Sequence, residues 1–519
     1  MGSPKKAKVE PGCSDRISSL PKEIKECILS NLDVQEAVRA SILSSAWRNV
    51  WTTMPDILLY DWSFASSVSP TTARSKFITL VDLALALHKG SLDTFILEAH
   101  RSFHDVIDRW VSMLSKKVPK AITIKFASGP KFKIHSSLFS ISDLKHLRVK
   151  YCIITLPRKF EGFKRLVVLN LKYFFCTDSD INYLISSCPM LNTLRLKYFE
   201  DINCLNIQAP VLEVLEVEGQ FEDLHLNAPS LLHANFTLDK TEAHKYVPVA
   251  HDGKRYLMQV FGSLADVKTL TVSGCFLTYL SKGCLLTKLP GAFHCLEKIG
   301  IESCFWNWTE ALAICSIFEN ARMLRELEIW SYPREEAYAR NGVWDQDETA
   351  IQKPPLDHLS MVTINEFRGL HCEVSFLGML LSWAPALEEL KIHRVNDEDD
   401  DSEEICMCKA LMRLLALPRV SPKAKLTCSI SDLYPKKCSD SDLWFGYSLP
   451  LTRIYAGGLG YSSVVVEVFC WERYTVLVVN GPLMSACCPA VFPVLFDNLN
   501  YTWITGQASE LNRVHKGWK

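Results

Sequence analysis

A short hydrophobic pattern recurs along most of the chain, with apolar residues at positions i, i+3 and i+5 of each copy. The last two apolar positions lie two residues apart, so their side chains share one face of a β-strand. Successive copies start 19 to 36 residues apart. The twelve copies begin at Leu92, Ala121, Leu144, Leu166, Leu191, Leu212, Leu231, Val267, Leu296, Leu324, Leu359 and Leu387.

This spacing is typical of leucine-rich repeats, in which each unit contributes one strand. A single unit cannot bury its own apolar face, whereas stacked units share a continuous core. We therefore predict an α/β fold, with a small three-helix segment in front of a curved solenoid. Short parallel strands line the concave side of this solenoid, and helices and loops lie on its outer side.

The segments between the repeats predict what lies on the outer side. Residues 180–185 and 376–383 read as helices, each ended by a following proline at 189 or 385, because proline disfavours helix in the residue before it. The units that end at Leu212 and Leu231 are only 21 and 19 residues long, so we expect loops there. Polar insertions are expected at residues 240–255 and 333–355.

The N-terminal residues 15–51 predict three short helices. Pro21 suits the first turn of a helix, and Ile24, Cys27 and Ile28 then recur at helical spacing. Asp33, with a glutamate three residues later, predicts the start of a second helix. A Ser-rich linker, residues 56–70, follows these helices, and a further amphipathic helix over residues 77–87 ends near a glycine.

The third predicted helix carries two tryptophans on one face, Trp47 and Trp51, and begins at Ser44 or Ser45. So small a bundle has too much surface for its volume to bury all its apolar side chains, so we expect a second polypeptide to cover some of them. A helical cap on the following domain is the alternative. The candidate partner-binding residues, some of which must form the core of the bundle, are Leu20, Pro21, Ile24, Ile28, Leu29, Leu32, Val38, Leu43, Trp47 and Trp51.

Composition narrows the function further. The 57 Lys and Arg residues nearly balance 58 Asp and Glu residues, so no global field favours nucleic acid or anionic membrane. Nineteen cysteines without a signal peptide predict reduced thiols. Neither Cys406 with Cys408 nor Cys487 with Cys488 has a second pair at zinc-site spacing. Phosphate-loop, zincin and nucleophile-elbow motifs are absent, so we expect no catalytic residues, metal or cofactor.

Residues 15–51 resemble the F-box of plant F-box proteins. In that family the helices dock on a Skp-type adaptor, which joins the protein to a cullin–RING ubiquitin ligase. The resemblance thus implies a protein partner and no catalysis by this chain. The residues that carry it are Asp15, Arg16, Ile17, Leu20, Pro21, Ile28, Leu29, Leu32, Ala37, Val38, Arg39, Ser41, Leu43, Ser44, Trp47, Arg48 and Trp51.

Two later stretches resemble the same plant group. Residues 108–111, Leu156 to Phe163 and the Cys-Pro-x-Leu at 188–191 look like F-box proteins with leucine-rich repeats, and residues 358–394 are similar to their FBD module. An acidic insertion, residues 397–404, departs from the pattern, and we expect it to form a solvated loop. The predicted organisation is an F-box at 15–55, a linker and capping helix at 56–90, repeats at 91–354 and an FBD module at 355–430.

Both ends of the chain leave alternatives open. Residues 431–519 carry no copy of the repeat and are either an unusual terminal cap or sequence added by an altered reading frame or retained intron; we favour the second. Residues 1–14 form a polar tail whose clustered lysines, at 5, 6 and 8, resemble a nuclear-localisation signal or are simply a solvated charge run. The expected location is the nucleus, the cytoplasm or both.

The resemblance implies a substrate receptor. The F-box would hold the adaptor, and the repeats would present a surface to a target protein for ubiquitination. The alternative is a scaffold or sequestering protein that uses the repeat surface without a ligase. The target itself cannot be read from repeats, because the fold does not determine the partner.

Overall fold

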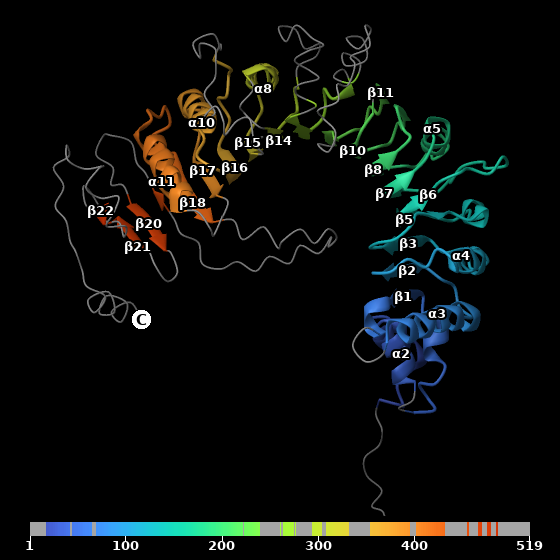
Figure 1. The fold of residues 1–519 in the computed structure, drawn as a ribbon. Helices are drawn as coiled ribbons and strands as arrows, with labels where there is room; N and C mark the ends of the chain where they lie inside the picture. Colours follow the sequence, from blue (N-terminus) through green and yellow to red (C-terminus); the bar gives the residue numbers. More distant parts are fainter. Residues whose placement is uncertain are drawn as a thin grey trace, which may run out of the picture. The chain divides into compact units, whose positions relative to one another are not determined.

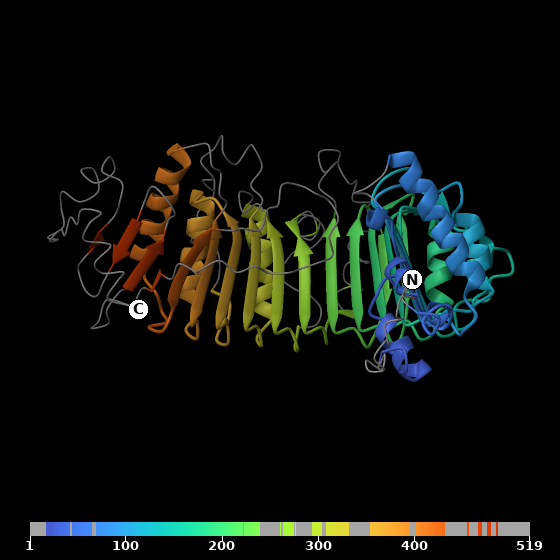
Figure 2. The same ribbon diagram turned by 90° about the horizontal axis from the view of Figure 1, so that it is seen from below.

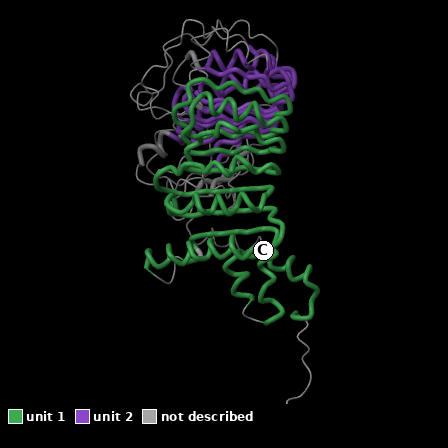
Figure 3. The backbone as a smooth tube through the Cα atoms, turned by 90° about the vertical axis from the view of Figure 1, so that its right-hand side faces the viewer, with its two compact units in different colours: residues 1–212 green, residues 213–519 purple. Residues whose placement is uncertain are grey.

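A computed structural model describes residues 17–41, 44–64, 69–221, 223–238, 263–274, 293–303, 308–331, 353–394 and 401–430, with Val260, Phe276 and four short strands between 454 and 485. The chain divides into two compact units, residues 1–212 and residues 213–519 (Figure 3). Each unit is built on its own set of parallel strands.

Two of the three predicted N-terminal helices are present. They are α1 (Lys22–Leu29), which follows Pro21, and α2 (Val34–Ala40). The predicted cap of α2 is confirmed, because Asp33 Oδ1 accepts the backbone N–H of Glu36 at 2.8 Å. The prediction of a third α-helix is wrong. Residues 45–49 form turns and lead into the short 3-10 helix η1 (Val50–Thr53).

The sheet of unit 1 has six parallel strands in the order β1-β2-β3-β5-β7-β8 (Figure 1). Buried side chains alternate with partly exposed ones along β1 and β2, as in Phe95 and Leu97 of β2, so one face forms the core. Two short strands, β4 (Phe132–Lys133) and β6 (Cys152–Ile153), pair beside this path. The six strands are β1 (Asp56–Tyr60), β2 (Thr94–Ala99), β3 (Ala121–Phe126), β5 (His146–Lys150), β7 (Val168–Phe175) and β8 (Thr193–Glu200).

Strand β1 corrects the prediction for residues 56–70. These residues were expected to form a linker, yet residues 56–60 pair in parallel register with β2, and η2 (Asp61–Phe64) follows. Ile57 and Leu59 are buried and, with the buried Met54, have the i, i+3, i+5 spacing of the repeats. The sheet therefore begins at the last turn of the N-terminal helices.

Helices of unit 1 follow the predicted pattern. The helix expected at 77–87 is α3 (Pro70–Leu87), capped by Ser69, and the one expected at 180–185 is α5 (Asp178–Ser186). The unit also contains α4 (Ile107–Ser115) and the 3-10 helix η3 (Ser136–Ser140). Gly162 has a φ of +92°, and a Cβ there would lie 2.1 Å from the Ser187 carbonyl oxygen, so only glycine fits.

Unit 2 contains eight parallel strands in the order β10-β12-β13-β14-β15-β16-β17-β18, which lie side by side in Figure 2. All twelve predicted repeat starts are thus followed by a described strand, which confirms the repeat assignment. The eight strands are β10 (Val214–Gly219), β12 (His233–Leu238), β13 (Thr269–Ser273), β14 (Lys298–Ser303), β15 (Glu326–Ser331), β16 (Met361–Phe367), β17 (Glu389–Arg394) and β18 (Lys425–Ile430).

Two predicted loops contain short strands instead. They are β9 (Cys204–Gln208) in unit 1 and β11 (Asp223–Asn227) in unit 2. Leu205 and Ile207 of β9 are buried, and Leu224 and Leu226 of β11 are buried in the same alternation. Units too short for a helix therefore bury their outer apolar residues through a strand.

The helices of unit 2 are α8 (Trp308–Asn320), α10 (His371–Trp383) and α11 (Asp401–Ala416). Helix α10 confirms the helix predicted at 376–383. The acidic insertion is not a loop throughout, because α11 begins at Asp401 inside it. The two polar insertions at 240–255 and 333–352 lie outside the described residues.

Residues 431–519 contribute four short strands in the described part of the chain. They form an antiparallel sheet in the order β19-β20-β21-β22, with β19 at Ile454–Tyr455, β20 at Val465–Phe469, β21 at Thr475–Val478 and β22 at Met484–Ser485. This pairing differs from the parallel pairing of the repeats. The two interpretations of this region both stay predictions.

Candidate functional site

Helix α1 presents apolar side chains to solvent. Ile24 and Ile28, one helical turn apart, are 47% and 43% exposed, and Ile17, in the turn before the helix, is also exposed. The buried residues of the same helix are Lys25 and Leu29. The stripe predicted from periodicity is therefore present, but it faces away from the core of the bundle. An exposed isoleucine ridge of this kind is typical of a surface that another protein covers.

The opposite side of α1 closes a small core. Leu29, Ala37, Trp47, Val50 and Met54 form this cluster, and Leu32, Ala40 and Trp51 pack against it. Lys25 covers Trp47, with Nζ 5.8 Å from the ring centre, and its ammonium group donates to the Ser18 carbonyl oxygen at 2.7 Å. This arrangement satisfies a buried cation through a carbonyl and an aromatic face.

The predicted partner-binding residues thus separate into three groups. Pro21, Ile24 and Ile28 are exposed, whereas Leu20, Leu32, Val38 and Trp51 are half-buried. Leu29 and Trp47 are core residues, with Trp47 only 6% exposed, and they belong to those expected to form the core of the bundle. Leu43 lies outside the described residues. Ile17, which carried the F-box resemblance, belongs with the exposed group and was not among the predicted site residues.

Hydrogen bonds attach the helical bundle to the first strands of unit 1. The Thr52 carbonyl oxygen accepts the N–H of Lys89 at 2.8 Å, and the Pro55 carbonyl oxygen accepts the N–H groups of Asp93 and Thr94 at 2.7 and 3.2 Å. These contacts join η1 and the start of β1 to the segment that leads into β2. The exposed ridge of α1 is therefore carried by a bundle that is continuous with the sheet.

A buried histidine lies at this junction. His88 Nε2 is 2.8 Å from the Met54 carbonyl oxygen, and Lys117 Nζ donates to the His88 carbonyl oxygen at 2.9 Å. Burial is the main cause that lowers the pKa of His88; the Lys117 charge adds to it, and the bond to Met54 opposes it. Burial also lowers the pKa of Lys117. The folded chain therefore favours the neutral imidazole.

Acid should destabilise this junction. The pKa of His88 is lower in the folded chain than in the unfolded chain, so the unfolded state takes up the proton first. The contribution of His88 to stability is complete above the unfolded pKa of about 6.5 and declines as the pH falls through the folded pKa. We expect the midpoint of urea unfolding of unit 1 to fall between pH 7.5 and pH 5.5. His88→Gln should reduce this fall, whereas replacing the exposed His104 by Gln should preserve it.

Other titratable groups in the described residues do not form a reactive centre. Burial raises the pKa of Cys188 to about 11 and the pKa values of Cys176 and Cys315 to about 12, so these thiols stay protonated at neutral pH. No group of three or more His, Cys, Asp or Glu side chains with metal-site geometry occurs in the described part of the chain. None of the described helices is long and apolar enough to cross a membrane.

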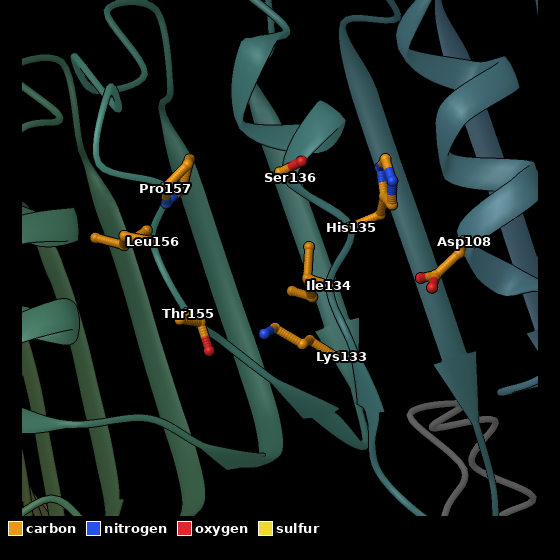
Figure 4. A pocket seen from close by; sticks show the side chains of 8 residues that line it. All are labelled: Asp108, Lys133, Ile134, His135, Ser136, Thr155, Leu156 and Pro157. Atoms are coloured by element: carbon orange, nitrogen blue, oxygen red, sulfur yellow. The ribbon is translucent and has the colours of Figure 1, made fainter.

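Figure 4 shows a pocket of about 330 Å³ on unit 1. Asp108 of α4 lies on one side, Thr155 to Pro157 lie on the other, and Lys133 and His135 lie between them. The His135 imidazole is engaged locally, since Nδ1 is 2.8 Å from Ser137 Oγ. The polar groups come from separate walls of an open hollow, and we assign no chemistry to it.

Comparison with known proteins agrees with this geometry. The F-box domain model matches residues 17–58, which include α1, α2, η1 and most of β1. The model for the leucine-rich repeats of the FBD-associated F-box protein At5g56370 matches residues 107–251. The first match covers Ile17, Ile24 and Ile28, and the second covers strands β3 to β12.

Relatives from Arabidopsis thaliana share this organisation. The F-box/FBD/LRR-repeat protein At1g13570 is 29% identical over 416 residues, covering 79% of this chain and 98% of the relative. The FBD-associated F-box protein At5g56370 is 24% identical over 444 residues, covering 79% of this chain and 99% of the relative. The chain thus carries an F-box domain and FBD-associated leucine-rich repeats, and it is homologous to F-box/FBD/LRR-repeat proteins of Arabidopsis.

Proposed function

We propose that this chain is the substrate-recognition subunit of a Skp–cullin–F-box ubiquitin ligase. The F-box docks a Skp-type adaptor, and the repeats bind a target protein. The observation that carries the proposal is the exposed ridge of Ile17, Ile24 and Ile28 on a domain that matches the F-box model. Leu83 and Leu87 of α3 are as exposed as these isoleucines, so it is the exposure together with the match to the F-box model that supports the ridge as the adaptor contact.

In this function the chain performs no chemistry itself. Bound adaptor and bound target are held on one polypeptide, which raises the effective concentration of target lysines near the ubiquitin carrier. Two elements of unit 1 support this division of labour. The ridge lies on α1, and the hydrogen bonds of Thr52 and Pro55 join the bundle to the strands. The polar N-terminal tail is consistent with a nuclear or cytoplasmic location, which we propose on sequence grounds alone.

The test is co-purification of a tagged full-length chain with a Skp-type adaptor. Ile24→Glu combined with Ile28→Glu should abolish adaptor binding, because two charges would be buried in an apolar interface. Leu83 and Leu87 of α3 provide a matched control, since they are also one turn apart and are 49% and 45% exposed. Leu83→Glu with Leu87→Glu should bind the adaptor as the wild type does.

Equal binding by the ridge variant and the wild type would contradict the proposal. The cellular level of the target protein distinguishes a ligase subunit from the scaffold alternative. A ligase subunit lowers the level of its target only when the ridge is intact, and proteasome inhibition restores that level. A sequestering protein would leave the target level unchanged by the ridge substitutions.

A further inference from the structure

Lys25 is a lysine buried on the inner side of α1. It is only 7% exposed, whereas its neighbour Ile24 is 47% exposed. Removing an ammonium group from water costs free energy unless the group is hydrogen-bonded, and an apolar side chain at the same position would avoid this cost. The lysine therefore needs a role that leucine or methionine could not perform.

The ammonium group of Lys25 reaches the turn that precedes α1. Its Nζ donates to the carbonyl oxygen of Ser18, seven residues earlier in the chain, at 2.7 Å, and lies 5.8 Å from the centre of the Trp47 ring. A charge-assisted hydrogen bond is about twice as strong as one between neutral groups. Lys25 thus ties the turn at residues 17–20 to the inner side of the helix, with the Trp47 ring as its support.

This turn carries Ile17, which is 64% exposed. The N–H of Leu20 donates to the Ile17 carbonyl oxygen at 3.3 Å, and the Lys25 bond acts on Ser18 in the middle of the turn. Pro21, the N-cap residue of α1, makes no side-chain cap hydrogen bond. Ile17 is therefore the residue of the ridge whose position depends on Lys25, because Ile24 and Ile28 are carried by the helix itself.

The helix has a separate attachment to the rest of the bundle. The Thr53 hydroxyl at the end of η1 donates to the carboxylate of Glu26, and Leu29 lies in the bundle core. Neither contact involves the ammonium group of Lys25. Removing that group should therefore release the turn while α1 keeps its place.

We propose that Lys25 is a positioning residue for the adaptor contact, because its ammonium group holds the turn that places Ile17. The inference rests on the proposed function, in which Ile17, Ile24 and Ile28 contact the adaptor. Without this hydrogen bond the turn samples other backbone conformations, and adaptor binding then has to restore the one in the structure. Fixing the backbone of a single residue costs free energy comparable to a tenfold change in affinity.

Lys25→Met tests this role, because it keeps an unbranched chain against Trp47 and removes the ammonium group. Isothermal titration calorimetry measures the Kd of the full-length chain for a purified Skp-type adaptor. We expect Lys25→Met to raise this Kd about tenfold. Lys25→Arg retains N–H donors and stacks on aromatic rings, so its Kd should stay within about threefold of the wild type. Lys76→Met removes the same charge from an exposed lysine of α3 and should leave the Kd unchanged.

Hydrogen exchange distinguishes positioning from a purely structural role. Replacing a buried charge by an apolar side chain is often neutral or stabilising, so the amides of α1 and α2 should keep their protection in Lys25→Met. The amide of Leu20, which is bonded across the turn, should exchange faster than in the wild type. Loss of protection throughout α1 and α2 would instead show that Lys25 only stabilises the bundle, and would overturn the inference.

Double-mutant cycles identify the residue through which Lys25 acts. Lys25→Met should weaken adaptor binding no further in an Ile17→Ala chain, but it should still weaken binding about tenfold in an Ile28→Ala chain. Equal affinity of Lys25→Met and the wild type, or full additivity with Ile17→Ala, would contradict the inference.

The ridge variant separates the two proposals. If Ile24→Glu with Ile28→Glu binds the adaptor as the wild type does, the proposed ligase function is rejected. If that variant loses the adaptor while Lys25→Met binds it normally, only the role of Lys25 is rejected.

Discussion

Trp47→Ala should unfold the F-box bundle rather than remove one contact from its surface. Trp47 is the largest side chain of the core formed with Leu29, Ala37, Val50 and Met54, and it is almost fully buried. Truncating a buried tryptophan to alanine costs about 3–5 kcal/mol. So small a bundle has little stability in reserve. We therefore expect adaptor binding to be lost together with the structure of α1 and α2.

Hydrogen exchange distinguishes this loss from that caused by the ridge variant. In Trp47→Ala the amides of α1 and α2 should exchange rapidly, while those of β5 and β7 keep their protection. In the Ile24→Glu, Ile28→Glu variant all of these amides should stay protected although the adaptor no longer binds. A Trp47→Ala chain with wild-type protection that still failed to bind would show that the indole itself contacts the adaptor.

Glu373→Ala should be the most destabilising single substitution of an acidic residue in unit 2. The Glu373 carboxylate is fully buried and accepts the N–H groups of Leu370 at 2.9 Å and Arg368 at 3.2 Å, together with the hydroxyl of Ser331. Burial raises the pKa of Glu373, although these donors partly oppose the shift. Alanine would leave the buried Ser331 hydroxyl and two partly buried N–H groups without this acceptor, at a cost of about 3 kcal/mol.

The measurement is the free energy of unfolding of the full chain followed by urea denaturation with a probe in unit 2. Glu388→Ala is the matched control, because Glu388 is exposed and its truncation should change stability by less than about 0.5 kcal/mol. The free energy of unfolding of Glu373→Gln should lie between those of the two alanine variants. The amide oxygen of glutamine still accepts hydrogen bonds, but its NH₂ group faces other donors. A Glu373→Ala chain as stable as the control would show that the carboxylate does not hold the β16–α10 connection.

The repeats were predictable because the pattern that encodes them is local. Each copy has its apolar residues within six positions, and the strand that follows buries them regardless of the neighbouring loops. Strand β1 was missed although Met54, Ile57 and Leu59 have the same i, i+3, i+5 spacing, with methionine in place of the usual leading leucine. Strands β9 and β11 were missed because the short length of their units excluded a helix but did not exclude a strand.

The site was predictable in its residues but not in their orientation. Periodicity shows that Ile24 and Ile28 share a face, yet it cannot show whether that face is inside or outside. In α1 the expected order is reversed, since Lys25 is buried by a carbonyl and the Trp47 ring while the isoleucines are exposed. Apolar content alone thus could not show which of the candidate residues, such as Leu29 and Trp47, form the core of the bundle.

The stacked tyrosines Tyr151, Tyr173 and Tyr198 correspond to a pattern that is visible in the sequence. Lys-Tyr occurs at 150–151, 172–173 and 197–198, each pair directly after the last leucine or valine of a repeat. The pattern alone does not predict that each lysine lies beside its tyrosine, because a regular strand would place the two on opposite faces. The left-handed backbone of the tyrosines brings them together. Such a conformation is imposed by tertiary packing and leaves no mark in residue periodicity.

Only Met54 and Pro55 separate η1 from β1. Met54 belongs to the bundle core, and the Pro55 carbonyl oxygen accepts the N–H groups of Asp93 and Thr94. This connection is therefore held at both residues. A protein bound at the isoleucine ridge would therefore have a fixed orientation relative to the first strands of unit 1, without a hinge between them. For the proposed ligase subunit, the choice of acceptor lysine would then be a matter of geometry, decided by where each lysine of the bound target points.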